Sequence, residues 1–248
     1  MTGETAGETA ESQWARYAPE GVLLDGFHAL KHALRFGARV PVALTTDRRA
    51  ALTLAEELAP DLTGPLDALL REVPGTTLRT LVPRPHPTGV AAVALRDAPA
   101  LPAAPEREAP LVVLDNPRNL GNVGAVVRLA AGAGAGGVLT TGDVDPWHPA
   151  AVRAGAGLHF ATPVERRTVA ELPDGPLLAF DPGGADLRTV TLPPGAMLAF
   201  GSERHGLSSE MRSRADRLVA LPMRPQVSSY NLATSVAMAL YHWMARFG

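Results

Sequence analysis

The sequence predicts an α/β fold with a parallel sheet in the C-terminal half, preceded by a smaller α/β domain. From residue 111 onward, short apolar runs that suit buried strands alternate with helical patterns, which is typical of parallel strands with helices on both faces. The stretch 97–110 (DAPALPAAPEREAP) is rich in Pro and Ala and has no hydrophobic periodicity, so we interpret it as an interdomain linker. A chain of 248 residues is long enough for two such domains.

Composition limits the classes of function. Hydrophobic residues make up 46% of the chain, so a well-buried core is expected, and the absence of cysteine excludes disulfides and thiolate chemistry. No apolar run reaches the roughly 18–20 residues that a membrane span needs. The acidic segment 1–19 lacks the features of a secretory signal, so we expect a disordered tail, no membrane partner and a cytoplasmic setting.

Charge alone does not indicate a nucleic-acid binder, because the net charge is −2. Only Lys31 is a lysine among the 23 basic residues. Arginine suits bidentate phosphate contacts, but a skewed genomic base composition would produce the same bias. Any RNA site must therefore be a local basic patch.

The first domain is expected over residues 20–96. Apolar residues at i, i+3, i+6 and i+7 from Phe27 predict a helix, which Gly37 ends. The patterns that follow predict, in order, a strand at 40–44, helices at 48–58 and 66–71, a strand at 78–82, and a turn from 85 that leads into a strand ending at 95.

The second domain is expected over residues 111–248. Its predicted strands are 111–114, 137–140, 177–180, 197–200 and 218–221, and its predicted helices are 121–133, 149–154, 208–214 and 231–246. Asn231 or Ser229 could cap the last helix, whose apolar stripe (Val236, Leu240, Met244, Phe247) suits core or a subunit interface. The run 132–137 satisfies G-x-G-x-x-G, but it follows a helix and precedes a strand, so we interpret it as a helix stop.

Three loops carry the candidate chemistry, and each follows a strand-like run. They read NLGNVGAVVR at 119–128, GSERHGL at 201–207 and LPMRPQVSSYN at 221–231. An open α/β sheet binds its ligand in such loops. Taken singly, the first could be the phosphate-binding helix start of an unrelated nucleotide enzyme, and a lone Glu203 between glycines is more often a cap or turn residue.

Together, these motifs resemble those of the TrmH/SpoU branch of the SPOUT RNA methyltransferases. They match the family patterns N-x-G-N-x-G-x-x-x-R, G-S-E-x-x-G-L and "IPM…SSLNVSVA". The segments GFHALKHAL and HPTGV of the first domain resemble a ribosomal-protein-like substrate-binding domain found in part of the family. Tyr230 stands where leucine is usual and Gly155 where serine is usual.

The resemblance implies a trefoil-knotted C-terminal domain that binds S-adenosylmethionine and transfers its methyl group to an RNA ribose 2′-hydroxyl without a metal. It implies donor contacts from Gly201, Leu221 and Tyr230, with Ser229 and Asn231, and catalytic roles for Arg128, Asn119, Glu203, Ser229 and Asn231. A guanidinium is a poor base. We therefore interpret Arg128 as a group that fixes the target phosphate and favours the developing alkoxide, oriented by Glu203 and supported by Asn119.

The resemblance also implies a homodimer whose RNA substrate is rRNA, with tRNA as the alternative, because tRNA-specific relatives more often have only short terminal extensions. A different alternative is a knotted RNA-binding factor without catalysis. A dehydrogenase is disfavoured by the misplaced glycine run. The arginines that flank the donor loops form a candidate phosphate-binding strip, although Arg212 and Arg214 could equally belong to a solvated helix face; the strip is Arg204, Arg212, Arg214, Arg217 and Arg224.

Overall fold

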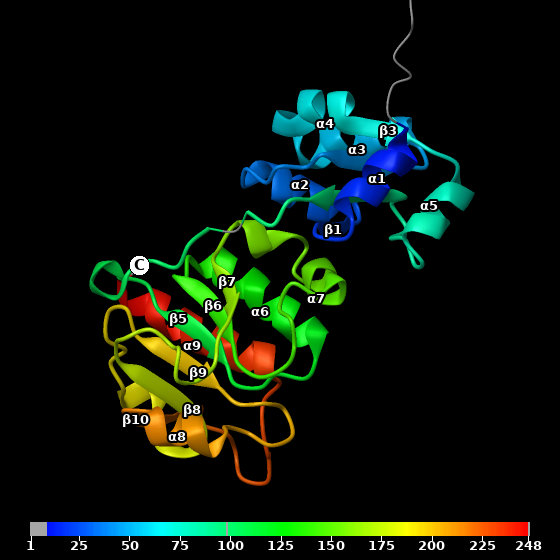
Figure 1. Cartoon of the computed structure of the whole chain (residues 1–248). Helices are drawn as coiled ribbons and strands as arrows, with labels where there is room; N and C mark the ends of the chain where they lie inside the picture. The colour runs from blue at the N-terminus through cyan, green and yellow to red at the C-terminus, as the bar shows by residue number, and fades with distance from the viewer. Residues whose placement is uncertain (1–8, 98, 248) are drawn as a thin grey trace, which may run out of the picture. The chain divides into compact units, whose positions relative to one another are not determined.

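The computed structural model describes residues 9–97 and 99–247, which belong to two compact units that divide after Asp97 (Figure 1). Each unit has its own sheet and its own buried core. Within the described residues, no helix combines the length and apolarity that a membrane crossing requires.

The first unit contains a mixed four-stranded sheet in the order β1-β4-β2-β3. Strand β4 pairs antiparallel with both β1 and β2, whereas β3 pairs parallel with β2. Its elements are α1 (Ala10–Tyr17), β1 (Val22–Asp25), α2 (Phe27–Arg35), β2 (Val42–Thr45), α3 (Arg48–Leu58), η1 (Pro60–Leu62), α4 (Thr63–Leu69), β3 (Leu70–Glu72), α5 (Gly75–Leu81) and β4 (Val90–Ala94).

Two predictions for this unit are wrong. The expected disordered tail over 1–19 contains helix α1, because Trp14 is 5% exposed and packs into the core with Leu44. Residues 1–8 of that tail lie outside the described residues. The expected strand at 78–82 is the end of helix α5, where Leu78 and Val82, one helical turn apart, are both buried in the same cluster.

The second unit contains a six-stranded sheet in the order β10-β8-β9-β5-β6-β7. Every pair of neighbours is parallel, which confirms the predicted parallel sheet. Its elements are η2 (Ala104–Glu106), β5 (Leu111–Leu114), α6 (Leu120–Ala133), β6 (Gly137–Thr140), α7 (Pro149–Ala154), η3 (Leu158–Phe160), β7 (Val164–Arg166), β8 (Leu177–Asp186), η4 (Leu187–Thr189), β9 (Met197–Phe200), α8 (Ser209–Arg214), β10 (Arg217–Ala220) and α9 (Leu232–Phe247).

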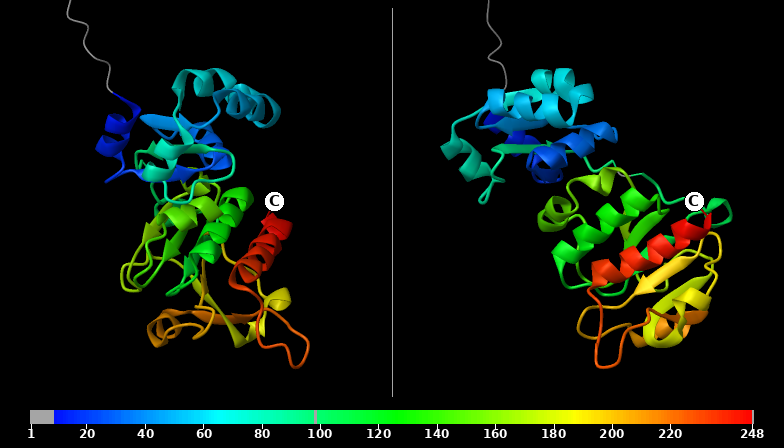
Figure 2. Two further views of the ribbon diagram at one scale, coloured as in Figure 1. Left: turned by 90° about the vertical axis from the view of Figure 1, so that its right-hand side faces the viewer. Right: turned by 180° about the vertical axis from the view of Figure 1, so that it is seen from behind.

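Helices cover both faces of this sheet. Helices α6 and α9 lie together on one face and α8 lies on the other (Figures 1 and 2). Residues Leu111 to Leu114 are all fully buried, and Leu111 and Val113 pack in one cluster with Met211 of α8. Strands buried on both faces give continuous apolar runs, which is why the sequence pattern predicted them.

The ends of α6 and the segment before β5 are fixed by specific residues. Helix α6 ends where Gly134 adopts φ 71°, and β6 starts at Gly137, so the run 132–137 is a helix stop and turn as predicted. Residues of the expected linker are built into the second unit. Arg107 is 5% exposed, its Nε donates to Gly195 O (3.0 Å), its Nη2 donates to Asp174 O (2.7 Å), and burial lowers its pKa.

Candidate functional site

The three motif loops follow the C-terminal ends of strands β5, β9 and β10. Strands β5 and β9 are parallel neighbours with Leu114 opposite Phe200, so the loops that follow them start side by side. This edge, beyond the carboxyl ends of parallel strands, is where open α/β sheets bind ligands.

A chain of side-chain hydrogen bonds joins the three loops. Asn122 Nδ2 donates to Glu203 Oε1 (2.6 Å), and Asn231 Nδ2 donates to Asn122 Oδ1 (3.3 Å). Asn231 Oδ1 accepts the amides of Ala233 (2.9 Å) and Thr234 (3.4 Å), so of the two predicted candidates, Asn231 and Ser229, it is Asn231 that caps α9. Because that cap fixes the Asn231 amide, Asn122 must present its oxygen to Asn231 and its nitrogen to Glu203.

Asn119 and Asn122 have different roles, although both lie in the first motif. Asn119 Oδ1 accepts the amides of Gly121 (2.8 Å) and Asn122 (3.2 Å), so Asn119 is the N-cap of α6. Its capping bond positions the backbone from which the Asn122 side chain reaches Glu203. The sequence analysis singled out Asn119 and missed Asn122. The available signal was that the same motif contains a second asparagine.

The first cavity, of about 310 Å³, contains six of the eight predicted site residues. They are Gly201, Glu203, Leu221, Ser229, Tyr230 and Asn231. The rings of Phe180 and Phe200 stack in its wall, with centroids 4.4 Å apart and planes at 12°. Its volume lies in the range of small-molecule sites, and its lining combines apolar walls with a few polar groups, which is typical of ligand pockets.

Two details shape this cavity. A Cβ on Gly201 would lie 2.1 Å from the carbonyl carbon of Gly206, so the loop can close on itself only with glycine there. Tyr230, which is 39% exposed, donates its hydroxyl to Pro222 O (3.1 Å). That bond ties the two ends of the third loop together across the cavity.

Asp115 connects the second loop to the sheet. It follows β5 directly and is 2% exposed. Its Oδ2 accepts the amide of Ser208 (2.6 Å) and its Oδ1 accepts the hydroxyl of Thr141 (2.7 Å). Sequence reasoning missed this residue, and a polar residue directly after an apolar run was the available signal.

Arg128 lies outside both cavities. It is exposed on α6, six residues after Asn122 and therefore about 120° around the helix from it. The contact expected between Glu203 and Arg128 is absent, because Glu203 bonds Asn122 instead.

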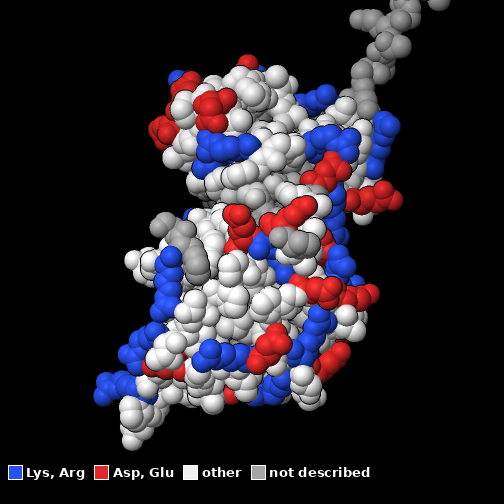
Figure 3. Space-filling model, turned by 90° about the vertical axis from the view of Figure 1, so that its left-hand side faces the viewer, with Lys and Arg blue, Asp and Glu red and all other residues white. Residues whose placement is uncertain are grey.

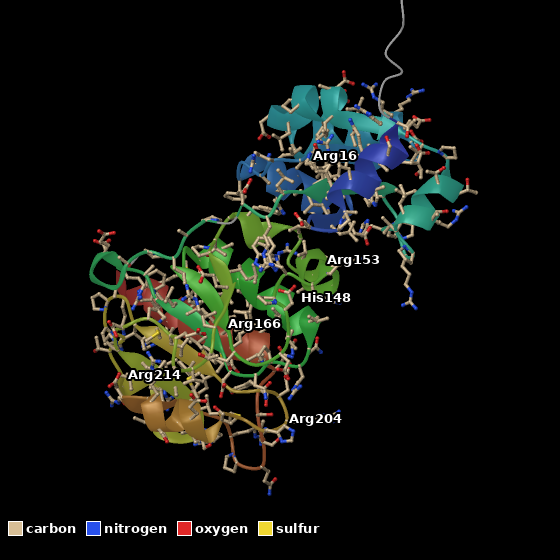
Figure 4. All side chains as sticks on the ribbon, viewed as in Figure 1. Arg16, His148, Arg153, Arg166, Arg204 and Arg214 are labelled. Carbon is tan, nitrogen blue, oxygen red and sulfur yellow. The ribbon has the colours of Figure 1, made fainter. Side chains whose placement is uncertain are left out.

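A second cavity, of about 700 Å³, adjoins the first and shares Glu203 with it. It is lined by Arg118, Asn119, Leu120, Gly121, Glu203, Arg204 and His205. In Figure 4, Arg204 projects at the margin of the loop after β9, far from Arg214.

The arginines of the expected phosphate-binding strip differ in their contacts, and two of them are engaged by other groups of the protein. Arg212 forms an ion pair with Asp181, and Arg214 donates to the carbonyls of Leu172 (2.6 Å) and Pro173 (3.3 Å). Burial alone would raise the pKa of Asp181, but hydrogen bonds from the Gly183 amide and Arg212 outweigh it and lower that pKa. Arg212 and Arg214 therefore hold the fold together.

Fold and site together define an α/β protein with a cavity at the C-terminal edge of a parallel sheet, lined by the second and third motif loops, to which hydrogen bonds join the first. The profile of the SpoU rRNA Methylase family matches residues 109–241, which is more than half of the chain. The chain belongs to this family.

Two curated relatives are methyltransferases from streptomycetes. The 23S rRNA (uridine(2479)-2′-O)-methyltransferase of Streptomyces viridochromogenes is 32% identical over 170 residues, in a match that covers 62% of this chain and 59% of that one. The 23S rRNA (adenosine(1067)-2′-O)-methyltransferase of Streptomyces laurentii is 30% identical over 148 residues, in a match that covers 53% of this chain and 52% of that one. The match thus spans less than two thirds of either relative.

Solved structures resemble this chain over nearly its whole length. A SpoU methyltransferase of Streptomyces viridochromogenes, crystallised in complex with AdoMet, superposes with a TM-score of 0.75 at 25% identity and covers 95% of this chain and 96% of that one. An RNA 2′-O ribose methyltransferase superposes with a TM-score of 0.75 at 27% identity, with 98% of both chains covered.

Proposed function

We propose that this protein transfers the methyl group of S-adenosylmethionine to a ribose 2′-hydroxyl of rRNA. The observation that carries the proposal is the hydrogen-bonded chain Glu203–Asn122–Asn231, because it joins the first family motif to the two motifs that line the first cavity. The two curated relatives named for 2′-O-methylation of 23S rRNA support the acceptor. Bacterial rRNA as acceptor would put the activity in the cytoplasm.

The donor is proposed to occupy the first cavity. Stacked Phe180 and Phe200 and the side chain of Leu221 offer apolar walls for a nucleoside, and Ser229 and Asn231 offer polar groups, so the residues present fit such a molecule. Gly201 and Tyr230 complete the proposed contacts. The donor supplies a methyl group on a positively charged sulfur, which is already activated for displacement.

In the proposed reaction, the ribose oxygen forms a bond to the methyl carbon while the bond from that carbon to sulfur breaks, and the hydroxyl proton leaves to solvent. The contribution of the protein is to align the three atoms and to exclude other arrangements. Asn122 holds the Glu203 carboxylate at the boundary of the two cavities, and Asn119 holds the helix start that carries Asn122. Arg128 is proposed to bind the target phosphate and to favour the developing alkoxide.

We further propose a homodimer, in which Arg128 reaches the cavity of the second copy. Arg128 lines neither cavity of its own chain, so the site needs a second source for this group. The exposed apolar face of α9, with Tyr241 73% and Met244 39% exposed, suits such an interface. Mixing Arg128→Ala chains with Asn231→Ala chains would then restore part of the activity, whereas sites complete within one chain would not recover.

The knotted threading of the C-terminal segment and the RNA-binding role of the first unit remain part of this proposal. For the tRNA alternative, a solved structure concerned with 2′-OH methylation of C/U34 on tRNA is 29% identical with a TM-score of 0.52, but the match covers only 56% of this chain. The two curated relatives whose names specify 23S rRNA favour rRNA.

The test is transfer of tritiated methyl from S-adenosylmethionine to unmodified large-subunit rRNA, small-subunit rRNA and tRNA, each assayed separately. We expect label in large-subunit rRNA that is lost in Arg128→Ala and retained in Arg188→Ala, whose arginine lines neither cavity. Arg128→Lys should also be strongly impaired, because the bidentate fork is lost. Label only in tRNA would select the alternative, and absence of donor binding would favour a non-catalytic RNA-binding factor.

A further inference from the structure

The second cavity holds cationic side chains that the fold itself does not use. Arg118 and Arg204 have no ion pair or side-chain hydrogen bond with any described residue. Other arginines of the protein are neutralised by carboxylates, as Arg188 is by Asp186 and Arg212 by Asp181. Two unpaired guanidinium groups in one cavity create a local preference for an anion, although the net charge of the whole chain is negative.

The rest of the cavity supports this reading. Its one carboxylate, Glu203, is held by Asn122, so two guanidinium groups face a single carboxylate and the local formal charge is positive. The amides of Gly121 and Asn122 at the start of α6 are already bonded to Asn119. An anion in this cavity would therefore be bound by the arginine side chains, with His205 as a third group in the lining.

The position of the second cavity indicates which kind of anion it binds. The second cavity shares Glu203 with the first, so a molecule held here lies beside the proposed donor site. On the face drawn in Figure 3, acidic and basic side chains lie next to one another over much of the surface. A polyanion that must present a hydroxyl to the first cavity would be anchored best by local phosphate contacts at its margin.

We propose that Arg118 and Arg204 bind backbone phosphates of the acceptor RNA strand next to the target ribose, so that the second cavity is the acceptor subsite. This inference rests on the proposed methyltransferase function and adds which residues hold the acceptor. Neither arginine lines the first cavity, so their contribution is to RNA binding and alignment and not to donor binding.

The test compares Arg118→Ala, Arg204→Ala and the control Arg188→Ala, which removes the same charge elsewhere in the same unit. Binding of in vitro transcribed large-subunit rRNA is measured by filter binding between 50 and 300 mM salt, roughly the range over which phosphate contacts dominate. Each cavity variant should weaken binding several-fold and reduce the slope of log K against log salt by about 0.7, the value for one single-strand phosphate contact. Arg118→Lys and Arg204→Lys should retain the slope, and donor affinity and Tm should not change.

In steady-state methyl transfer, the cavity variants should raise KM for rRNA more than they lower kcat. Unchanged salt slopes in both alanine variants, with methyl transfer intact in the unaltered protein, would overturn the acceptor subsite and leave the proposed function standing. If the unaltered protein neither bound nor methylated any RNA, the proposed function would fail and this inference with it. A slope reduced equally in Arg188→Ala would also overturn it, because the effect would then be general charge.

Discussion

The contact between α6 and α7 yields a sharp test of the second unit, because two glycines of the same helix should respond to alanine in opposite directions. A Cβ on Gly124 would lie 2.2 Å from Ala151 O, 2.7 Å from Ala154 Cβ and 2.7 Å from Gly155 N. A Cβ on Gly132 would meet nothing within 4 Å. Gly132→Ala is therefore the matched control.

The expected magnitudes follow from these contacts. The backbone of α7 would have to retreat by about 1 Å to accept Gly124→Ala, and overpacking of this kind costs about 1–3 kcal/mol. Two of the three contacts are backbone atoms, so we expect the upper end, reduced by a helix-propensity gain of up to about 1 kcal/mol. The net loss is about 2 kcal/mol. Gly132→Ala should gain about 0.5 kcal/mol, because it lies near the helix end.

The assay is urea unfolding followed by far-UV circular dichroism, with the slopes of the transitions compared to confirm that only stability has changed. Methyl transfer measured alongside should fall in Gly124→Ala, because α6 also carries Asn122. Equal stability of the two variants would refute the packing of α6 on α7 described here.

Three further predictions concern polar groups. Asn122→Ala should lower kcat at least tenfold with donor affinity little changed, because the Glu203 carboxylate loses its donor; an unaltered kcat would exclude Asn122 from the site. Arg107→Ala should lower the free energy of unfolding by about 2–4 kcal/mol in urea, since it leaves the Gly195 and Asp174 carbonyls without their donor; a change under about 0.5 kcal/mol would contradict that. Asp181 has a lowered pKa in the folded state, so its stabilisation is present above the ordinary carboxyl pKa near 3.8 and is lost as pH falls through the folded value. Asp181→Asn should therefore be destabilised at pH 7 and match the unaltered protein near pH 2, as Tm against pH would show.

Most of the fold of the second unit could be predicted because its strands are buried on both faces. Runs such as Leu111–Leu114 and Met197–Phe200 have no other plausible environment in a chain of this composition. The misses are short or marginal elements. Strand β7 has three residues. Helix α5 has seven, and its Leu78 and the C-cap residue Val82 fit both a period of two and a helical turn. Only their shared burial in the core decides between helix and strand.

For the site, the sequence located the loops but could not orient the side chains within them. Asn119 and Asn122 are both amides in one motif, and the start of α6 between them decides which one caps and which one points at Glu203. Arg128 has the right spacing along the chain, but the helical rotation takes it to another face. Arg118 was not predicted as a site residue, because a single arginine in a loop belongs to no sequence pattern and its role depends on which residues lie beside it in the fold.

The order of the strands explains why one segment can both cross the sheet and enclose the first cavity. Strand β10 lies at the sheet edge, with β8 and β9 between it and β5, so the chain after β10 must travel about 14 Å to bring Asn231 to Asn122. The ten residues from Leu221 to Tyr230 could span about 33 Å if extended. The surplus length lets the segment fold over the cavity, and the Tyr230 hydroxyl on Pro222 O closes it. The strand order forces the segment from Leu221 to Tyr230 to cross from β10 toward β5. Its additional length, beyond the distance it must cover, forms the wall of the proposed ligand site.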